Sequence, residues 1–330
     1  MKRMPAEATR YRYEEHGGAD VLKEDRHPLD GPGSGEVVVE VVSAGISHID
    51  SFIREGQEHV FHDDPWPRFS GSDFAGIVRA VGSHVSGFRP GDEVIGHVRS
   101  GAHATFVTVS AGAIVAKPRT MSWEIAGGLY LAGATALEML DDLRIGASDV
   151  VVVSAAAGGV GSLEVQLAKR RSARVIGTCG ERNFDYLRQL GIIPVRYGDG
   201  LADRIRHVSR GQVTAYIDNF GKDGRDVAAD LGVPAERYRS SADRRDVELR
   251  LLQDDPVSVA HGTDLLRRVA TLYAEGAFRL LVSGLYPLSD IAEAYRDLSQ
   301  LHARGKIVLA TNPVSPYRVT KARDLHESMA

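Results

Sequence analysis

The chain has 330 residues, of which 43% are hydrophobic and 25% are charged, and its formal net charge at pH 7 is −4. This composition is typical of a globular protein, the length favours two domains, and the weak negative charge gives no reason to expect a nucleic acid or an anionic membrane as a partner. The one cysteine, Cys179, excludes an intrachain disulfide and a multi-cysteine zinc site. The first residues lack the apolar core of a signal peptide, and no apolar run is long enough to span a membrane, so we expect a cytoplasmic protein without a membrane partner.

The first third of the chain predicts short β-strands joined by tight turns. Residues 36–42 are rich in valine and follow a Gly-Pro-Gly turn signal, and a second strand is expected at residues 74–81. A further Pro-Gly turn at residues 90–91 precedes another strand. Short strands separated by such turns indicate a barrel-like β-domain.

After about residue 120 strands and helices alternate. Residues 150–153 form a continuous apolar run, as expected of a buried parallel strand, and a helix follows with apolar residues at helical spacing. The further predicted elements are strands at residues 174–178, 192–195 and 215–217 and a helix at residues 183–190. This order indicates a doubly wound α/β domain with a parallel sheet.

Near residue 280 the pattern of the first domain returns. An amphipathic helix is predicted at residues 291–298 and a last strand at residues 306–310. We therefore assign residues 1–122 and 281–330 to the β-rich domain and residues 123–280 to the α/β domain.

A glycine-rich segment joins the first strand of the α/β domain to its helix. It contains Ala157, Gly158, Gly159, Val160 and Gly161. Small residues at this place let the backbone approach a pyrophosphate, while the helix N-terminus directs free N–H groups at it. The position between a strand and a helix favours a dinucleotide site over the alternative, a glycine-rich turn without a ligand.

The end of the next strand favours NADPH over NADH. NAD sites normally carry a carboxylate there to bind the ribose 2′-hydroxyl, but this strand ends at Gly180 and Arg182 follows, whose guanidinium can pair with a 2′-phosphate. Glu181 is a signal against this interpretation unless it points away. Asn219 and Phe220 end a later strand, at the sheet edge where ligands bind in such folds, although a simple turn explains them as well.

Several of these segments together resemble the quinone oxidoreductase and enone reductase branch of the medium-chain dehydrogenases/reductases. The similarity spans roughly residues 10–312 and includes the glycine segment followed by Leu-Ala-Lys, together with Gly-Ser-Asp-Phe-Ala-Gly at residues 71–76 and Gly-Lys-Ile-Val-Leu at residues 305–309. It implies a GroES-like catalytic domain with a Rossmann domain, and a homodimer paired near residues 278–282. It also implies that Tyr197 packs near the adenosine phosphate end and that Gly180 lacks a serine contact common in relatives.

Zinc enzymes of the same superfamily carry a cysteine at the position of Ser47 and a histidine at the position of Ser72. Neither ligand is present, so the resemblance implies a zinc-independent reaction. His59, His62 and the aspartates at residues 63–64 form a second polar cluster. We interpret this cluster as part of a loop at the rim of the substrate cleft rather than as a metal site.

The resemblance implies four candidate catalytic positions. His48 lies beside the lost zinc ligand, and Phe52 and His103 stand where relatives often have tyrosine. Thr135 matches a helix start that faces the nicotinamide in relatives. Alternatives remain open, because His48 also suits a buried structural histidine and Thr135 an ordinary hydroxyl at a helix start. Tyr130 is a candidate proton donor that fits the core better.

The sequence therefore predicts NADPH-dependent reduction of a small quinone or α,β-unsaturated carbonyl compound by hydride transfer, without zinc. The altered tyrosine positions keep an alternative open, namely a redox-silent NADPH-binding protein or a non-redox biosynthetic catalyst on the same fold. A zinc alcohol dehydrogenase is disfavoured by the missing ligands.

Overall fold

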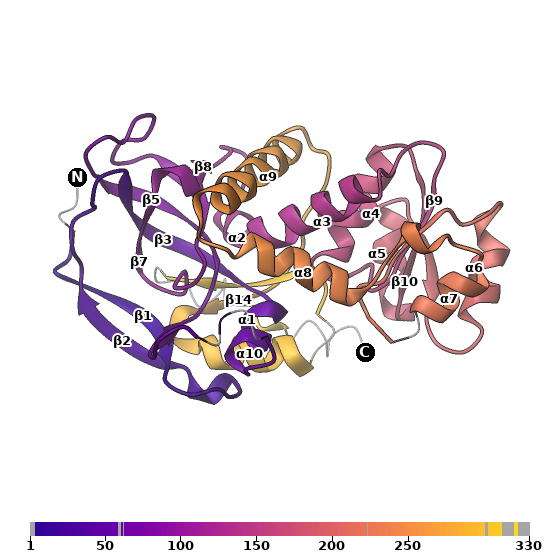
Figure 1. The fold of residues 1–330 in the computed structure, drawn as a ribbon, viewed down its shortest axis with the longest axis horizontal. Helices are drawn as coiled ribbons and strands as arrows, with labels where there is room; N and C mark the ends of the chain where they lie inside the picture. Colours follow the sequence, from indigo (N-terminus) through magenta and orange to yellow (C-terminus); the bar gives the residue numbers. More distant parts are fainter. Residues whose placement is uncertain are drawn as a thin grey trace.

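The computed structural model describes residues 4–58, 61, 63–222, 224–300, 303–311 and 320–322. Figure 1 shows a β-rich lobe built from both ends of the chain and a second lobe around a parallel sheet, with long helices between them. The mixed α/β architecture predicted from the sequence is confirmed.

The β-rich lobe contains two sheets whose strands come from both ends of the chain. Its strands are β1 (Glu7–Tyr13), β2 (Lys23–Pro28), β3 (Glu36–Ile46), β4 (Arg68–Phe69), β5 (Asp73–Val81), β6 (Glu93–His97), β7 (Phe106–Ser110), β8 (Ile114–Ala116), β14 (Val282–Pro287) and β15 (Lys306–Ala310). The larger sheet has the order β14-β15-β3-β5-β6-β8, with β7 also paired to β3, and the smaller one has the order β2-β1-β4. Because β15 pairs with β3, the end of the chain returns to the first lobe.

Strand β3 is the centre of this lobe and is longer than the sequence predicted. It runs to Ile46 rather than to residue 42, because β5, β7 and β15 all pair along it. Val37, Val38, Val39 and Val41 are buried, so side chains on both faces of the strand are covered. Its far end delivers Ser47 and helix α1 (His48–Arg54) to the boundary with the second lobe.

The second lobe contains a five-stranded parallel sheet of order β11-β10-β9-β12-β13. Its strands are β9 (Val150–Val153), β10 (Arg174–Cys179), β11 (Ile193–Arg196), β12 (Ala215–Ile217) and β13 (Tyr238–Arg239). Along β9, Val151 and Val153 pack into one core cluster and Val150 and Val152 into another, so both faces of the strand are covered. The predicted strand positions are confirmed within one residue at each end.

The helices cover both faces of this sheet and fill the space between the lobes (Figure 1). Besides α1 they are α2 (Trp123–Gly127), α3 (Tyr130–Asp142), α4 (Gly161–Arg170), α5 (Phe184–Gln189), α6 (Leu201–Ser209), α7 (Gly224–Asp230), α8 (Ser241–Leu251), α9 (Pro256–Ala274) and α10 (Ile291–Gln300). The helix expected at residues 183–190 is shorter than predicted, because a 3₁₀ turn over Glu181–Asn183 precedes α5. The buried helix α3 packs on α4, α8 and α9 and joins the lobes.

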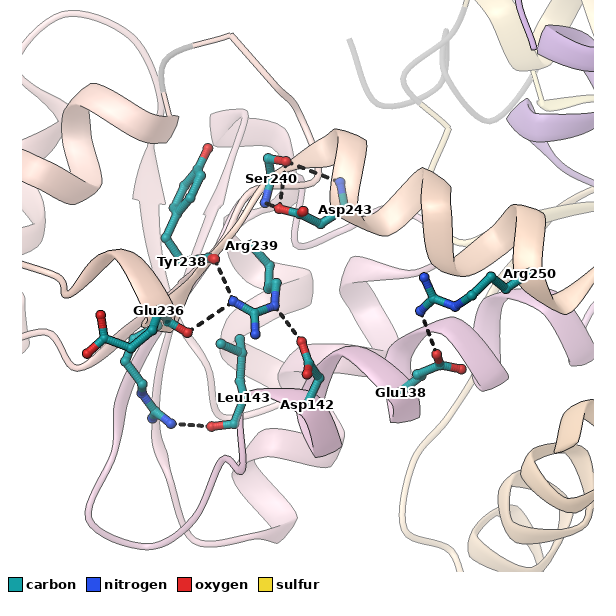
Figure 2. Close-up of polar contacts among 10 residues, drawn as sticks. Glu138, Asp142, Leu143, Glu236, Tyr238, Arg239, Ser240, Asp243 and Arg250 are labelled. Carbon is teal, nitrogen blue, oxygen red and sulfur yellow. Dashed lines mark hydrogen bonds and ion pairs between the residues drawn. The ribbon is translucent and has the colours of Figure 1, made fainter. Parts of the chain in front are cut away.

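Ion pairs join α8 and the preceding strand β13 to α3 beside a cavity of about 490 Å³ that α9 also lines. Figure 2 shows that Arg250 reaches Glu138 at 2.8 Å and that Arg239 reaches Asp142. The cavity wall carries many charged side chains beside the apolar Met139, Val247 and Leu265. The two ion pairs hold α8 and β13 against α3.

Candidate active site

The glycine segment forms a tight loop between β9 and α4. Ala155 adopts a left-handed conformation with φ of 48°, and Gly158 donates its N–H to the Ala155 carbonyl at 2.9 Å. A Cβ atom on Gly161 would lie 2.5 Å from that carbonyl oxygen, which is closer than atoms approach. The loop therefore requires glycine at the first residue of α4. The Ser162 and Leu163 N–H groups of the first turn donate to the Gly158 and Val160 carbonyls at 3.0 and 2.9 Å, so an anion here would be stabilised chiefly by the positive end of the helix dipole.

The ends of β10 and β11 form a basic edge next to this loop. Gly180 follows β10 directly, and Arg182 lies in the 3₁₀ turn after it. Arg196, which the sequence analysis missed, ends β11 opposite Cys179, and its guanidinium lies 3.3 Å from the Glu181 carboxylate. The negative charge of Glu181, which counted against a 2′-phosphate, is thus paired with a cation.

Two exposed aromatic rings stand at the same edge. Tyr197 and Phe220 stack with ring centroids 6.1 Å apart, so the structure brings together two residues that the sequence analysis assigned to the cofactor. The guanidinium of Arg204 donates to the backbone carbonyls of residues 196–199 at 2.7–3.4 Å and so fixes the loop that carries Tyr197. A Cβ atom on Gly180 would lie 3.6 Å from the Tyr197 hydroxyl, which is an ordinary contact.

Asn219 connects the end of β12 to a buried carboxyl group. Its amide donates to Glu164 at 2.5 Å and to the Ser154 carbonyl at 3.3 Å. Burial raises the pKa of Glu164 to about 7, against the effect of Asn219 and of the Arg244 guanidinium. Glu164 lies in the first turn of α4 and was missed from the sequence, because helical spacing alone does not separate a buried carboxyl from a solvated one.

The two lobes meet where β15 passes the glycine loop. Gly305 donates its N–H to the Ala157 carbonyl at 2.9 Å. The next residue, Lys306, is buried, and its ammonium donates to the Ile46 carbonyl at 2.8 Å and to Ser47 Oγ at 2.7 Å. A cation of the last strand therefore reaches the N-cap of α1 beside the glycine loop.

Two buried aspartates flank this lysine. The Asp50 carboxylate accepts the Ser47 N–H at 2.8 Å, and the Asp73 carboxylate accepts the Leu131 N–H at 3.2 Å. Burial raises the pKa of Asp50 to about 7 and that of Asp73 to about 6, and the positive charge of Lys306 opposes both changes. The junction thus holds groups that change charge near neutral pH.

His48 and Phe52, two of the candidate catalytic residues, lie on α1 beside this junction. His48 is exposed, and its ring lies 6.4 Å from that of Phe52. The Arg245 guanidinium of α8 lies over the Phe52 ring at 4.7 Å and pairs with Glu58 at 3.0 Å. Glu58 belongs to the loop predicted to form the cleft rim, so this loop is tied to α8.

His103, a third candidate, is fully buried inside the β-rich lobe. Its ring nitrogens lie 3.0 Å from Ser70 Oγ and 2.9 Å from the Gly45 carbonyl. Burial lowers its pKa to about 4, so it is neutral at pH 7. Ser70 also contacts the hydroxyl of Tyr295, which hydrogen-bonds to Asp50, so His103 reaches the junction only through a chain of buried groups.

Thr135, the fourth candidate, lies within α3 and is completely buried. Its hydroxyl oxygen has no hydrogen-bond partner among the described residues. Tyr130 at the start of α3 is also buried, donates to the Leu251 carbonyl at 2.8 Å and stacks on His97. Tyr130 therefore belongs to the core, as the sequence favoured.

Within the described part of the chain, no three histidine, cysteine, aspartate or glutamate side chains are grouped so that they could hold a metal ion. Ser47 and Ser72, at the positions of zinc ligands in related enzymes, instead lie beside Lys306 and Asp73. His59 and His62 of the loop cluster lie outside the described residues, and Asp64 pairs with Arg99 at 2.6 Å. Among the described residues, every helix is too short or too polar to cross a membrane.

Comparison with known proteins identifies the family. Residues 33–119 match the alcohol dehydrogenase GroES-like domain, and residues 192–309 match the zinc-binding dehydrogenase domain. The chain is 28% identical to a chloroplast envelope quinone oxidoreductase homolog of Arabidopsis thaliana, over 89% of this chain and 95% of that protein. It belongs to the quinone oxidoreductase branch of the medium-chain dehydrogenases/reductases.

Solved structures of this family agree with the fold. The quinone oxidoreductase from Coxiella burnetii has a TM-score of 0.78 at 27% identity and covers 93% of this chain and 100% of its own. The Escherichia coli quinone oxidoreductase complexed with NADPH has a TM-score of 0.78 at 25% identity, covering 92% of this chain and 99% of its own. The predicted pairing of a GroES-like domain with a Rossmann domain is therefore confirmed, and the chain is an oxidoreductase.

Proposed function

We propose that this medium-chain reductase uses NADPH to reduce a small quinone or an α,β-unsaturated carbonyl compound, without zinc. The observation that carries the proposal is the glycine loop, whose packing leaves no room for a side chain on Gly161, next to an edge that presents Arg182 and Arg196. This combination suits a pyrophosphate at the helix N-terminus and a phosphate at the strand end. Relatives of this chain include an NADPH-dependent alkenal/one oxidoreductase from Arabidopsis thaliana, at 28% identity.

The residues at the sheet edge fit the dinucleotide. Gly158 to Gly161 would hold the pyrophosphate, Arg182 and Arg196 the 2′-phosphate, and Tyr197 with Phe220 would flank the adenosine. Asn219 would lie toward the nicotinamide half. When bound, NADPH supplies a hydride for an electron-poor carbon of the substrate.

We propose that residues of the β-rich lobe position the substrate and supply charge near it. His48 and Phe52 lie on α1, which begins beside the glycine loop, and we propose that they contact the cofactor and the substrate. Thr135 and His103 act from within the core, His103 through Ser70 and Tyr295. Quinones and enones suit a site without a metal, because their acceptor carbon is already electrophilic.

We also propose a cytoplasmic homodimer that pairs near residues 278–282. Leu281 is partly exposed there, and the Gln166 side chain bonds both the N–H and the carbonyl of Arg279. Light scattering coupled to size-exclusion chromatography tests the dimer. A monomer at micromolar concentration would contradict it.

The test of function is a fluorescence titration with NADPH and NADH, followed by NADPH oxidation with a panel of quinones and enones and by a metal assay. We expect tighter binding of NADPH than of NADH, turnover with at least one class of acceptor, and full activity after dialysis against a chelator. NADPH binding without turnover would favour the redox-silent alternative. Loss of activity on chelation would overturn zinc independence.

A further inference from the structure

The junction contains a hydroxyl group that a buried cation polarises. Lys306 Nζ donates to Ser47 Oγ at 2.7 Å and to the Ile46 carbonyl at 2.8 Å. An ammonium has hydrogen-bond donors and no acceptor, so the hydrogen of the Ser47 hydroxyl cannot return to Lys306. It remains to donate to a group in the junction, and the positive charge behind the oxygen makes it a stronger donor.

The position of this hydroxyl is fixed from two sides. Ser47 is the N-cap of α1, and its N–H donates to Asp50 at 2.8 Å. The side chain of Lys306 runs against the glycine loop, since a Cβ atom on Gly159 would lie 3.1 Å from Lys306 Cδ. Ser47 therefore stands half-buried beside the loop that we assign to the cofactor, on the side from which α1 carries His48 and Phe52.

Charged and titratable groups surround the pair on several elements. Asp50 and Arg54 come from α1, Asp73 from β5 and Tyr295 from α10. The two aspartates have raised pKa values, because burial disfavours their charged forms. A protonated aspartate balances no positive charge, so an added negative charge near Ser47 is met by the cation of Lys306.

We propose that Ser47 is a catalytic hydrogen-bond donor to the carbonyl oxygen of the substrate, and that Lys306 is the positioning residue that polarises it. The donor stabilises the negative charge that develops on this oxygen when the conjugated carbon takes up hydride. The inference rests on the proposed function for its substrate class, and it explains how a site without a metal handles an enolate or a hydroquinone anion.

The experiment measures the binding of an anion that mimics the enolate oxygen. The NADP⁺-saturated protein is titrated with 4-nitrophenolate by its absorbance shift, and with 4-nitroanisole as a neutral probe of similar shape. Ser47→Ala and Ser47→Gly are compared with Ser47→Thr, which keeps a hydroxyl. Glycine caps a helix nearly as well as serine, so Ser47→Gly separates the donor from the cap.

We expect Ser47→Ala and Ser47→Gly to weaken 4-nitrophenolate binding roughly tenfold or more, as is typical of a hydrogen bond to a charged group, with little change for 4-nitroanisole. Ser47→Thr should stay within about threefold of the wild type. Ser240→Ala, which removes the same kind of capping box from α8, is the matched control and should change neither probe. Lys306→Met should weaken 4-nitrophenolate binding to the same extent as Ser47→Ala.

In the binding measurement, the inference is overturned by absence of 4-nitrophenolate binding to the wild type, or by equal binding to the wild type, Ser47→Ala and Ser47→Gly. The measurement does not depend on turnover. Enone reduction that persists in Ser47→Gly would leave the proposed function standing and refute the donor. Ser47-dependent 4-nitrophenolate binding without any NADPH oxidation would support the donor and count against the reductase.

Discussion

The two sides of the site are built in different ways. The side that we assign to the cofactor consists of backbone and exposed groups at one sheet edge: the glycine loop, two strand ends and the rings of Tyr197 and Phe220. The side that we assign to catalysis consists of buried titratable groups, such as Asp50, Asp73 and Lys306, which come from distant parts of the chain. Steric fit and solvent-screened charges therefore determine the effect of a substitution on the first side, whereas desolvation determines it on the second.

The largest effect is expected for Gly161→Ala on the cofactor side. The new Cβ would lie 2.5 Å from the Ala155 carbonyl, and the backbone there cannot move without opening the loop. We expect the Kd for NADPH in a fluorescence titration to rise about a hundredfold or more, because the phosphate cradle is lost.

Gly211→Ala is the control for this change, since a Cβ atom at Gly211 meets nothing within 4 Å. Circular dichroism checks that both variants fold. Binding of NADPH by Gly161→Ala with the wild-type Kd would mean that the loop does not hold the pyrophosphate.

On the buried side, Glu164→Gln should change the pH dependence of stability. The pKa of Glu164 is raised from 4.5 to about 7 by burial, so between these pH values the folded protein holds a proton that the unfolded chain has lost. Its favourable contribution is therefore complete below pH 4.5 and is lost as the pH rises to about 7. Relative to the wild type, we expect Glu164→Gln to gain on the order of 2 kcal/mol in the free energy of unfolding between pH 5 and pH 8.

Urea denaturation at the two pH values measures this difference. Glu15→Gln, at the surface, is the control and should show no such gain. Because Asp50 and Asp73 contribute slopes of the same sign, only the difference between variant and wild type is informative. Parallel pH profiles for the wild type and Glu164→Gln would show that Glu164 is ionised in the folded state at both pH values.

A smaller effect is expected for the exposed arginines. Arg182→Gln removes a charged donor to the 2′-phosphate and should raise the Kd for NADPH roughly tenfold while leaving that for NADH unchanged. Arg196→Gln should act in the same direction, because Glu181 then faces the phosphate without its partner. Arg188→Gln, which removes an exposed arginine paired with Asp185, is the control. Equal losses of affinity for NADPH and NADH in Arg182→Gln would place Arg182 away from the 2′-phosphate.

The contrast between local groups at the sheet edge and buried groups from distant parts of the chain also determines how much of the site the sequence could predict. The glycine loop, Gly180 and Arg182 are local features, and the alternation of strands and helices places them at one sheet edge, so the fold and this edge followed from the sequence. Arg196 could have been found by asking what ends the neighbouring strand. The hydrogen bond between Ser47 and Lys306 joins residues 259 positions apart, and no local pattern marks such a pair.

His103 shows that burial, like long-range pairing, could not be predicted from the sequence. Its place in the sequence, where relatives often have tyrosine, suggested a residue that faces the substrate. In the structure it bonds Ser70 and the Gly45 carbonyl and is fully enclosed. Residue type and position are the same for an exposed and a buried histidine, and only the packing of β3 with the loop before β7 separates them.

The smallest predicted effect is a gain in affinity for NADPH. Gly180 has an ordinary φ of −69°, and a Cβ atom there would make only a normal contact with the Tyr197 hydroxyl. Gly180→Ser therefore fits without strain and adds a donor beside Arg182, so we expect the Kd for NADPH to fall roughly threefold to tenfold and that for NADH to stay unchanged. Gly180→Ala is the matched control, with the same backbone restriction and no hydroxyl. If serine and alanine tighten NADPH equally, the gain comes from a stiffer turn; if neither does, the 2′-phosphate lies closer to Arg196 than to the end of β10.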